Sequence, residues 1–439
     1  MNTEEKLNCS DQQQDAIAYL RTTAAIRERC DRLFNLACAD QLKYFRCNLD
    51  KLDTVANYVI KVMYEEYPDL NIPFHSRWRH FEVGNIARLS ELETKLSGLT
   101  PIEKAQTKFD LAIVSVLLDA GAGADWKYCE PQTGLVFSRS EGLAVASFRM
   151  FCEGAFSSNP KYPLQADAEG LQQLTTEKLA QAFQVDEANP LLGLEGRVKL
   201  LQKLGQALVS LPEFFGKENE RPGNLVNYLI ASDSNFSSFT GGVGGWGLQQ
   251  VAPIKQQLAA TTVLSAVLAG LGNIWSGRLT IAGVNLGDVW LHPALVGTNP
   301  SDQYVPFHKL SQWLTYSLLE PLQELGLEIT GLDEMTGLSE YRNGGLCLDL
   351  GLLEVKNIAI LEECHLPGSE VIVEWRALTV SLLDRIAANI RQQLHQSSTE
   401  LPLVKILQGG TWTAGRRIAN QLRSGGVPPL QIESDGTVF

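Results

Sequence analysis

Apolar side chains recur every three or four positions along most of this chain, which is the spacing of one buried helical face. Residues 278–292 instead form a shorter, strand-like stretch interrupted by two glycines. The pattern therefore predicts a mainly α fold with about ten helices and a few short strands. The predicted helices cover residues 12–39, 49–64, 101–118, 140–151, 174–183, 194–208, 256–277, 306–325, 374–394 and 412–422.

Several predicted helices begin with a recognisable signal. Ser10 or Asp11 can cap the first helix. Residues 100–103 read Thr-Pro-Ile-Glu, a capping box with proline at the first helical position. Pro306 suits the first turn of another helix, and this places Lys309 near the start of that helix.

Polar chemistry is concentrated in residues 332–353. Glu340, Tyr341 and Arg342 put a carboxylate, a phenol and a guanidinium in consecutive positions, just before an Asn-Gly-Gly turn. Leucines at positions 346, 348 and 350 predict a short strand with Asp349 on its other face. The stretch could form a wall of an active site. It is also compatible with a surface turn whose charges pair weakly, which is a common arrangement.

Composition narrows the class of protein. The net charge of −13 and pI near 5.1 argue against general binding to nucleic acid or to anionic membranes. The eight cysteines show no C-x-x-C spacing, which fits reduced cytosolic thiols better than disulfides or a zinc site. The polar N-terminus shows no signal peptide, and residues 256–277 contain too many polar side chains for a membrane span. We therefore expect a soluble, cytoplasmic protein.

The sequence lacks the other common catalytic motifs, so catalysis by carboxylates is the remaining option. The sequence contains no G-x-S-x-G, H-E-x-x-H or phosphate-binding loop, and its six histidines have no metal-ligand spacing, so no metal is predicted. A carboxylate can stabilise or trap the oxocarbenium-like state of glycosidic cleavage. By motif context, the acids nearest the candidate site are Glu340, Asp349 and Glu374. Lys309, if it lies beside Glu340, would keep that carboxylate ionised at neutral pH.

Other segments could bind a ligand. Residues 75–81 gather histidines, arginines and aromatics in a predicted loop, which suits either a ligand rim or a packed helix entry. Small residues at 120–124 separate Asp119 from Asp125 and Trp126, so these three could line a pocket or a solvated helix end. Ser140 is a possible N-cap that places Glu141 in the first turn of its helix.

A possible phosphate site lies near the C-terminus. Residues 409–411, Gly-Gly-Thr, are predicted to introduce the last helix, and Arg416 and Arg417 follow one turn later. Free N–H groups at a helix start, with two guanidiniums nearby, would suit a phosphate. A plain capped helix with exposed arginines explains the same residues.

Several long motifs resemble the uracil-catabolism protein four family of fungi and bacteria. The resemblance spans nearly the whole chain, and it implies a part in a ring-opening route for uracil that passes through ribosylated intermediates to urea. The motifs are HSRWRHF (75–81), LLDAGAGADWKY (117–128), RSEGLAVASFRMF (139–151), GLSEYRNGGLCLDLG (337–351), VEWRALTVSLLD (373–384), GGTWTAGRRIA (409–419) and SDGTVF (434–439).

The motif order from residue 139 onward is also similar to the queuosine-salvage nucleoside glycosylases, α-helical relatives of the helix-hairpin-helix DNA glycosylases. That resemblance implies one glycosylase-like domain over residues 1–439, with an N-terminal helical layer at about 1–98. Lys309 stands in the position of a lysine at a helix start, and Glu340-Tyr341-Arg342 stands where those enzymes have Asp-Tyr-Arg with the catalytic Asp. The longer Glu340 leaves its role open between nucleophile and electrostatic stabiliser, with Asp349 as a rival.

Together these expectations describe an N-ribosidic hydrolase that releases urea from N-ribosylurea or its 5′-phosphate, without a cofactor. Its partner would be a small ribosylated substrate, and other enzymes of uracil degradation could associate with it. The alternatives are a non-catalytic binding or assembly protein, which the Gly-rich residues 241–247 permit, and an amidohydrolase acting on the opened ring. The catalytic residues expected are Glu340, Lys309 and Asp349. The substrate-binding residues expected are Asp119, Asp125, Trp126, Glu141, Tyr341, Arg342, Glu374 and Arg376, and the phosphate-binding residues are Thr411, Arg416 and Arg417.

Overall fold

The computed structural model describes residues 10–123, 125–232, 256–275, 278–297 and 299–433, and most of these residues are helical. The mainly α class predicted from the sequence is thereby confirmed. No helix among these residues has both the length and the apolar composition needed to cross a bilayer. The Gly-rich residues 241–247 and the 434–439 motif lie outside the described part of the chain.

The chain divides into two compact units, each built from segments that are distant in sequence. Unit 1 comprises residues 1–75, 275–313 and 332–439, and unit 2 comprises residues 76–274 and 314–331. The N-terminal layer predicted at about 1–98 therefore contributes to both units. The single glycosylase-like domain stays a prediction.

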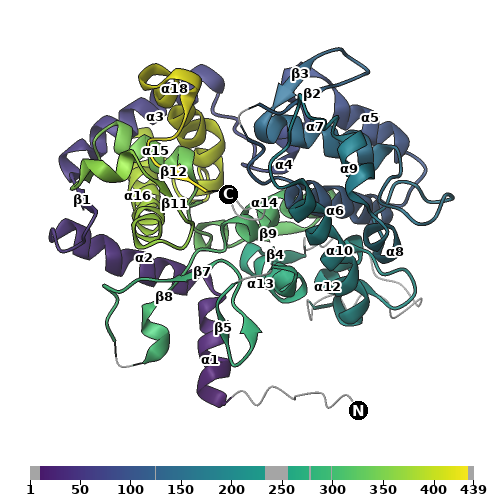
Figure 1. The fold of residues 1–439 in the computed structure, drawn as a ribbon, viewed down its shortest axis with the longest axis horizontal. Helices are drawn as coiled ribbons and strands as arrows, with labels where there is room; N and C mark the ends of the chain where they lie inside the picture. Colours follow the sequence, from purple (N-terminus) through teal and green to yellow (C-terminus); the bar gives the residue numbers. More distant parts are fainter. Residues whose placement is uncertain (1–9, 124, 233–255, 276–277, 298, 434–439) are drawn as a thin grey trace, which may run out of the picture. The chain divides into compact units, whose positions relative to one another are not determined.

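Unit 1 is built around one long helix, α16. Helices α2 and α3 pack against α16, and α15 packs against both α16 and α18 (Figure 1). Residues of α16 are buried on all sides near its first turns, as expected of a central helix. The helices of unit 1 are α1 (Asp11–Leu20), α2 (Thr23–Cys38), α3 (Leu52–Glu66), α15 (Tyr341–Asp349), α16 (Glu370–Leu394), α17 (Leu403–Ile406) and α18 (Trp412–Leu422).

The strands of unit 1 are short and form two-stranded sheets. The antiparallel pair β7–β8 aligns Val289 with Pro306 and Leu291 with Tyr304, and it ends just before helix α14, which begins at Lys309. Helix α14 (Lys309–Glu324) begins in unit 1 and continues in unit 2. The strand pairs are β1 (Phe45–Cys47) with β10 (Leu353–Val355), β5 (Thr280–Ile281) with β6 (Val284–Asn285), β7 (Val289–Leu291) with β8 (Tyr304–Pro306), and β11 (Cys364–His365) with β12 (Gln431–Ile432).

Unit 2 is a helical assembly in which α6 and α7 are central. Helix α4 packs on both of them, and α10 packs on α8 and α9. The helices are α4 (Arg77–Phe81), α5 (Arg88–Lys95), α6 (Pro101–Leu117), α7 (Arg139–Cys152), α8 (Ala168–Gln172), α9 (Thr176–Ala182), α10 (Leu194–Ser210), α11 (Pro212–Phe215), α12 (Leu225–Ser232) and α13 (Ala260–Leu271). The strand pairs are β2 (Lys127–Cys129) with β3 (Val136–Ser138), and β4 (Gln257–Ala259) with β9 (Glu328–Thr330).

Two predicted capping signals are confirmed. Ser10 and Gln13 form a reciprocal capping box at the start of α1, and Thr100 and Glu103 do the same for α6. The first predicted helix is nevertheless two helices, because the Thr22 side chain accepts a hydrogen bond from the Ala25 amide and starts α2 anew.

Three other predicted helix starts are wrong. Ser138, rather than Ser140, occupies the N-cap position of α7, and Pro306 belongs to β8 instead of the first turn of α14. Residues 407–411 form a π-helical turn that joins α17 to α18, so the glycines at 409 and 410 lie inside a helical run. Residues 77–81, predicted as a loop, form the short helix α4.

The predicted strand at residues 346–350 is also wrong, because α15 covers it. The two glycines that suggested a turn lie within this helix. A Cβ on Gly344 would lie 2.7 Å from Cε2 and 2.8 Å from Nε1 of Trp375, and 2.8 Å from Oγ1 of Thr379. The missing side chain therefore allows α15 to pack closely against α16.

Replacing Gly344 by alanine should destabilise the protein by about 1–3 kcal/mol, although alanine is the better helix former. The added methyl group would collide with Trp375, which is buried and cannot move aside freely. Gly345→Ala is the matched control, because its nearest neighbour, Cδ of Pro429, is 3.2 Å away and a smaller effect is expected. Thermal unfolding of both variants tests this, and equal melting temperatures for G344A and the wild type would contradict it.

Candidate active site

Glu340 is the N-cap residue of α15, and its carboxylate turns back onto the start of its own helix. Its Oε1 accepts a hydrogen bond of 2.6 Å from the amide of Asn343, and its Oε2 accepts one of 2.9 Å from the amide of Arg342. The side chain is buried. Each carboxylate oxygen can accept more than one hydrogen bond, so both retain a lone pair for a further interaction.

Lys309 is the first residue of α14, and it acts electrostatically on the Glu340 carboxylate. Its backbone N–H donates a hydrogen bond of 3.1 Å to Oδ2 of Asp288. Both residues lie in unit 1, and the charge of Lys309 lowers the pKa of Glu340, as expected of a nearby lysine; the catalytic pairing of the two stays a prediction. Asp288 lies between β6 and β7, and nothing in the sequence points to it, because no motif or spacing distinguishes it from other acidic residues.

Arg376 of α16 connects the two sides of this site. Its guanidinium forms a bidentate ion pair with Asp288, with N–O distances of 2.8 Å and 2.7 Å. Its Nε donates to the carbonyl of Ser339, the residue before Glu340, at 3.4 Å. The guanidinium also lies 4.1 Å from the centre of the Phe307 ring. Arg376 was expected to bind substrate, but its guanidinium is buried in these contacts.

The two carboxylates of the site experience opposite electrostatic effects. Burial raises the pKa of Glu340 above its ordinary value, and the Arg342 amide, the Lys309 ammonium and the Asn343 amide only partly oppose this. Burial alone would also raise the pKa of Asp288. The Arg376 guanidinium, the Trp290 indole and the Lys309 amide outweigh that effect and hold it well below its usual range. The pKa of Asp288 is thus lowered, whereas that of Glu340 is raised.

Replacing Lys309 by methionine should raise the pKa of Glu340 further, because a cation that favours the ionised carboxylate is lost. If ionised Glu340 is required for turnover, the acid limb of the pH–rate profile moves to higher pH. We expect a loss of roughly tenfold in kcat/KM at neutral pH. Lys309→Arg retains the charge and should keep the limb near its original position. An unshifted limb in Lys309→Met would contradict the assigned role of this lysine.

The two residues after Glu340 differ in accessibility. Tyr341 is half-buried, and Cζ of Arg342 lies 5.0 Å from the centre of its ring. Arg342 is buried and donates a hydrogen bond of 2.8 Å to the carbonyl of Gly426. Tyr341 is therefore the more accessible of the two predicted substrate contacts.

Asp349, the predicted rival nucleophile, lies at the opposite end of α15 from Glu340. Nine residues of helix at about 1.5 Å each separate the two ends. The Asp349 carboxylate forms a bidentate ion pair with Arg423, with N–O distances of 2.8 Å and 2.5 Å. The structure therefore does not bring Asp349 to the Glu340–Lys309 pair.

Glu374 lies in the only group of residues within the described chain that could hold a metal ion, together with His292 and Glu370. Its Oε1 accepts the amides of Tyr44 and Phe45, at 3.1 Å and 2.7 Å, and so anchors strand β1. Its Oε2 lies 3.6 Å from Nε2 of His292, and neither atom has a hydrogen-bond partner.

The histidine tautomer does not suit a metal ligand. Nδ1 of His292 accepts the amide of Ala294 at 3.2 Å, so the proton of the neutral ring is on Nε2 and is directed toward Glu374. Because Nδ1 is occupied by the Ala294 amide, His292 would have to bind through Nε2, and that needs the reverse tautomer with a bare Nε2 and a proton on Nδ1. Glu370 also pairs with Lys43, at 3.4 Å. We therefore assign this group to structural support of β1.

The residues predicted to bind phosphate are dispersed along one helical run. Arg417 forms ion pairs with Glu65 and Glu66, which neutralise its charge, and Arg416 is exposed above the Trp412 ring. Thr411 is buried within the π-helical turn. The free amides of a helix start, which were the basis of this prediction, are absent at residues 409–411.

A second polar cluster lies in unit 2 and contains two of the predicted residues. Arg77, fully buried, pairs with Asp119, and its Nε donates to Oγ of Ser115 at 2.7 Å. The hydroxyl of Ser140 donates to Asp119 at 2.9 Å. Glu141 lies near enough to act on the charge of Arg77. Segments 75–81, 117–128 and 139–151 therefore converge on one buried ion pair.

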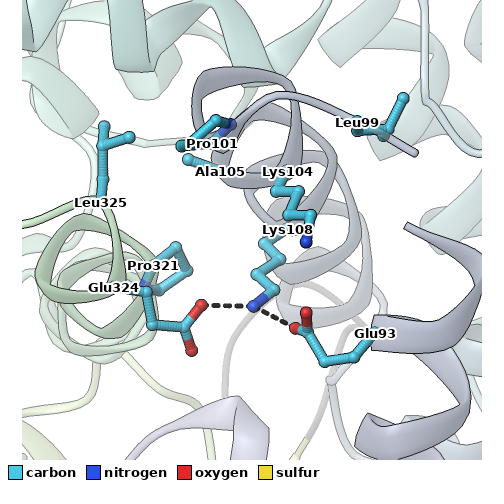
Figure 2. A pocket seen from close by; sticks show the side chains of 9 residues that line it. All are labelled: Glu93, Leu99, Pro101, Lys104, Ala105, Lys108, Pro321, Glu324 and Leu325. Carbon is cyan, nitrogen blue, oxygen red and sulfur yellow. Dashed lines mark hydrogen bonds and ion pairs between the residues drawn. The ribbon is translucent and has the colours of Figure 1, made fainter. Parts of the chain in front are cut away.

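The other two predicted residues of unit 2 separate from this cluster. Trp126 is fully buried, and its indole N–H donates to the carbonyl of Phe183 at 3.0 Å, whereas Asp125 is exposed. A cavity of about 300 Å³ in unit 2 also contains none of the predicted residues. There, Lys108 lies between Glu93 and Glu324 and pairs with both (Figure 2).

The protein is thus mainly helical, and its candidate site contains a buried glutamate that accepts two backbone amides and is influenced by the charge of a lysine. A sequence model described as "Protein of unknown function (DUF1688)" matches residues 19–439, so the chain belongs to the DUF1688 family. It is 40% identical over 433 residues to "Protein urg3" of Schizosaccharomyces pombe, covering 97% of this chain and 99% of that protein. It is 36% identical over 453 residues to "Uracil catabolism protein 4" of Lachancea kluyveri, covering 96% and 99%. The family recognised from the sequence motifs is confirmed.

Proposed function

We propose that the protein acts in uracil catabolism and hydrolyses the N-ribosidic bond of N-ribosylurea or of its 5′-phosphate. The name of the Lachancea kluyveri relative, similar over nearly the full length of both chains, supports the pathway. The observation that carries the reaction is the buried Glu340 carboxylate, oriented by two backbone amides and accompanied by Lys309.

In this reaction the bond between the anomeric carbon and the urea nitrogen breaks, and water supplies the hydroxyl of the sugar and the proton of urea. Positive charge develops on the sugar as the bond lengthens, and a fixed carboxylate stabilises it or attacks the anomeric carbon. The two amides hold Glu340 without consuming all its lone pairs. Lys309 favours the ionised form that either role requires.

Purified protein incubated with N-ribosylurea, and separately with its 5′-phosphate, should release urea and the corresponding sugar. Colorimetric urea detection and mass spectrometry of the sugar measure the two products, and the preferred substrate shows whether a phosphate is recognised. An unribosylated alkylurea serves as the control and should stay intact. Tight binding of a ribosylurea by calorimetry without urea release would refute a hydrolase and favour a binding protein.

A further inference from the structure

The corner between strand β8 and helix α14 is held by one residue of a different segment, Asp288. The main-chain carbonyl of Asp288 accepts the amide of Phe307 at 2.9 Å and that of His308 at 3.4 Å. Its side-chain Oδ2 then accepts the amide of Lys309 at 3.1 Å. Three successive amides leading into α14 are therefore bound by a single residue, which sets the direction in which Lys309 leaves the corner.

The corner is conformationally unusual, so its geometry depends on these contacts. His308 has a φ of 46°, a left-handed conformation that costs free energy for a residue with a Cβ. The ring of His308 is buried, and its Nε2 is 2.8 Å from the carbonyl of Leu20. Without an acceptor for the Lys309 amide, relaxation of this residue would redirect the first turn of α14.

The same carboxylate also connects the corner to Glu340. Asp288 pairs through both oxygens with Arg376, and Arg376 donates to the carbonyl of Ser339, directly before Glu340. The indole of Trp290 adds a hydrogen bond of 2.7 Å to Oδ1 of Asp288 and fixes its orientation. The contacts thus run from the Lys309 backbone, through Asp288 and Arg376, to the residue that precedes Glu340.

We propose that Asp288 is a positioning residue for the hydrolysis of the ribosidic bond: through the Lys309 amide and through Arg376, it keeps the Lys309 ammonium beside the Glu340 carboxylate. This inference rests on the proposed function for its catalytic meaning. Whether Asp288 holds Lys309 in place is a property of the protein alone, so it can be tested without substrate.

A positional role and a purely electrostatic role predict opposite results when Asp288 becomes asparagine. Removing a negative charge near the site, with Lys309 still in place, would lower the pKa of Glu340. Releasing Lys309 from its position would raise that pKa, because the stabilising cation is lost. The charged groups that act on Glu340 are Lys309 and Arg342, and Asp288 itself is paired with Arg376.

The test is a mutant cycle read by the titration midpoint of Glu340. The midpoint is followed by 13C NMR of protein with labelled glutamate carboxyls, and Glu340→Gln identifies the signal. The midpoint is measured in wild type, Lys309→Met, Asp288→Asn and the double variant. We expect Lys309→Met to raise it in the wild-type background, Asp288→Asn to raise it as well, and the double variant to show no further increase.

A Lys309→Met effect of the same size in both backgrounds, or a lower midpoint in Asp288→Asn, would overturn the proposal. Asp288→Glu keeps the charge and serves as a second variant if the asparagine variant does not fold, and a midpoint between those of the wild type and Lys309→Met is expected. Asp110→Asn is the matched control in unit 2, since Asp110 also pairs with an arginine, Arg221, and accepts backbone amides. Its midpoint should equal that of the wild type.

Activity measurements on the same variants distinguish a failure of the proposed hydrolysis from a failure of the positioning role of Asp288. If the proposed reaction is correct, Asp288→Asn should lower kcat/KM about tenfold and move the acid limb to higher pH, as Lys309→Met does. Absence of urea release by the wild type would refute the proposed function, while the titration cycle would still decide whether Asp288 positions Lys309.

Discussion

Glu340→Gln should abolish urea release from N-ribosylurea, with a loss of at least about 10³-fold in kcat. Glutamine is nearly isosteric and its Oε1 can still accept an amide from Arg342 or Asn343, so α15 keeps part of its cap. It carries no negative charge with which to stabilise the oxocarbenium-like state or attack the anomeric carbon. The loss should therefore appear in kcat more than in KM.

Two opposing effects on stability should nearly cancel in the same variant, so a loss of activity can be distinguished from unfolding. Burial raises the pKa of Glu340 in the folded protein, so the stability associated with this group is present below its unfolded pKa and is lost as pH rises. A neutral glutamine removes the cost of burying a charge but offers one acceptor oxygen to two backbone amides, so the melting temperature should change little. Glu354→Gln, at a partly exposed ion pair with Arg46, is the control and should retain full activity. Unchanged turnover in E340Q would remove Glu340 from the reaction.

Replacing Glu130 by alanine should cost about 3–5 kcal/mol of stability, the largest effect we expect outside the active site. Glu130 is fully buried and accepts hydrogen bonds of 2.7 Å and 2.6 Å from Arg88 and of 2.7 Å from Arg149. Alanine would leave the Arg88 guanidinium buried without the carboxylate it pairs with, and Arg149 would keep only Glu91. Chemical denaturation of the variant and of Glu91→Gln tests this, since Glu91 is partly exposed, pairs with Arg149, and should matter by less than about 1 kcal/mol.

Because of the hydrogen bonds to Glu130, the stability of the folded protein should decrease in acid. Burial opposes ionisation of Glu130, but hydrogen bonds from Arg88, Thr133 and Arg149 lower its pKa to about 2. A carboxyl with a lowered folded pKa contributes stability above its unfolded value of about 4.5, and that contribution is lost as pH falls toward 2. The melting temperature of the wild type should therefore fall across this interval more steeply than that of Glu130→Gln. Parallel curves would contradict the prediction.

Sequence signals predicted the structure correctly where it depends only on residues close together in the chain. The capping boxes that begin at Ser10 and Thr100 need only residues three positions apart, and both form as predicted. Helical periodicity over a long segment likewise identified α16, although it begins four residues earlier than predicted. Such interactions involve neighbours in the chain, so the sequence contains all the information they require.

The same local rules failed where packing between distant segments decided the outcome. Gly344 favours a turn by propensity, but close contact with Trp375 places it in a helix. Gly409 and Gly410 looked like a helix start. In the structure a Cβ on them would lie 2.7 Å and 2.5 Å from side-chain atoms of Ile72 and Val59, so they too mark tight packing. A glycine in a sequence does not reveal whether backbone freedom or the absence of a side chain is what the fold uses.

The sequence by itself determined the mainly helical class, the family, and the expectation that Lys309 acts on Glu340. Only the tertiary structure decided the rest of the site: it added Asp288, paired the predicted Arg376 with it, moved Asp349 to the far end of α15, and paired Arg417 with Glu65 and Glu66. The physical reason is that charge pairing depends on distances between segments up to hundreds of residues apart. No periodicity or motif along the chain records those distances, whereas burial in the folded core imposes them.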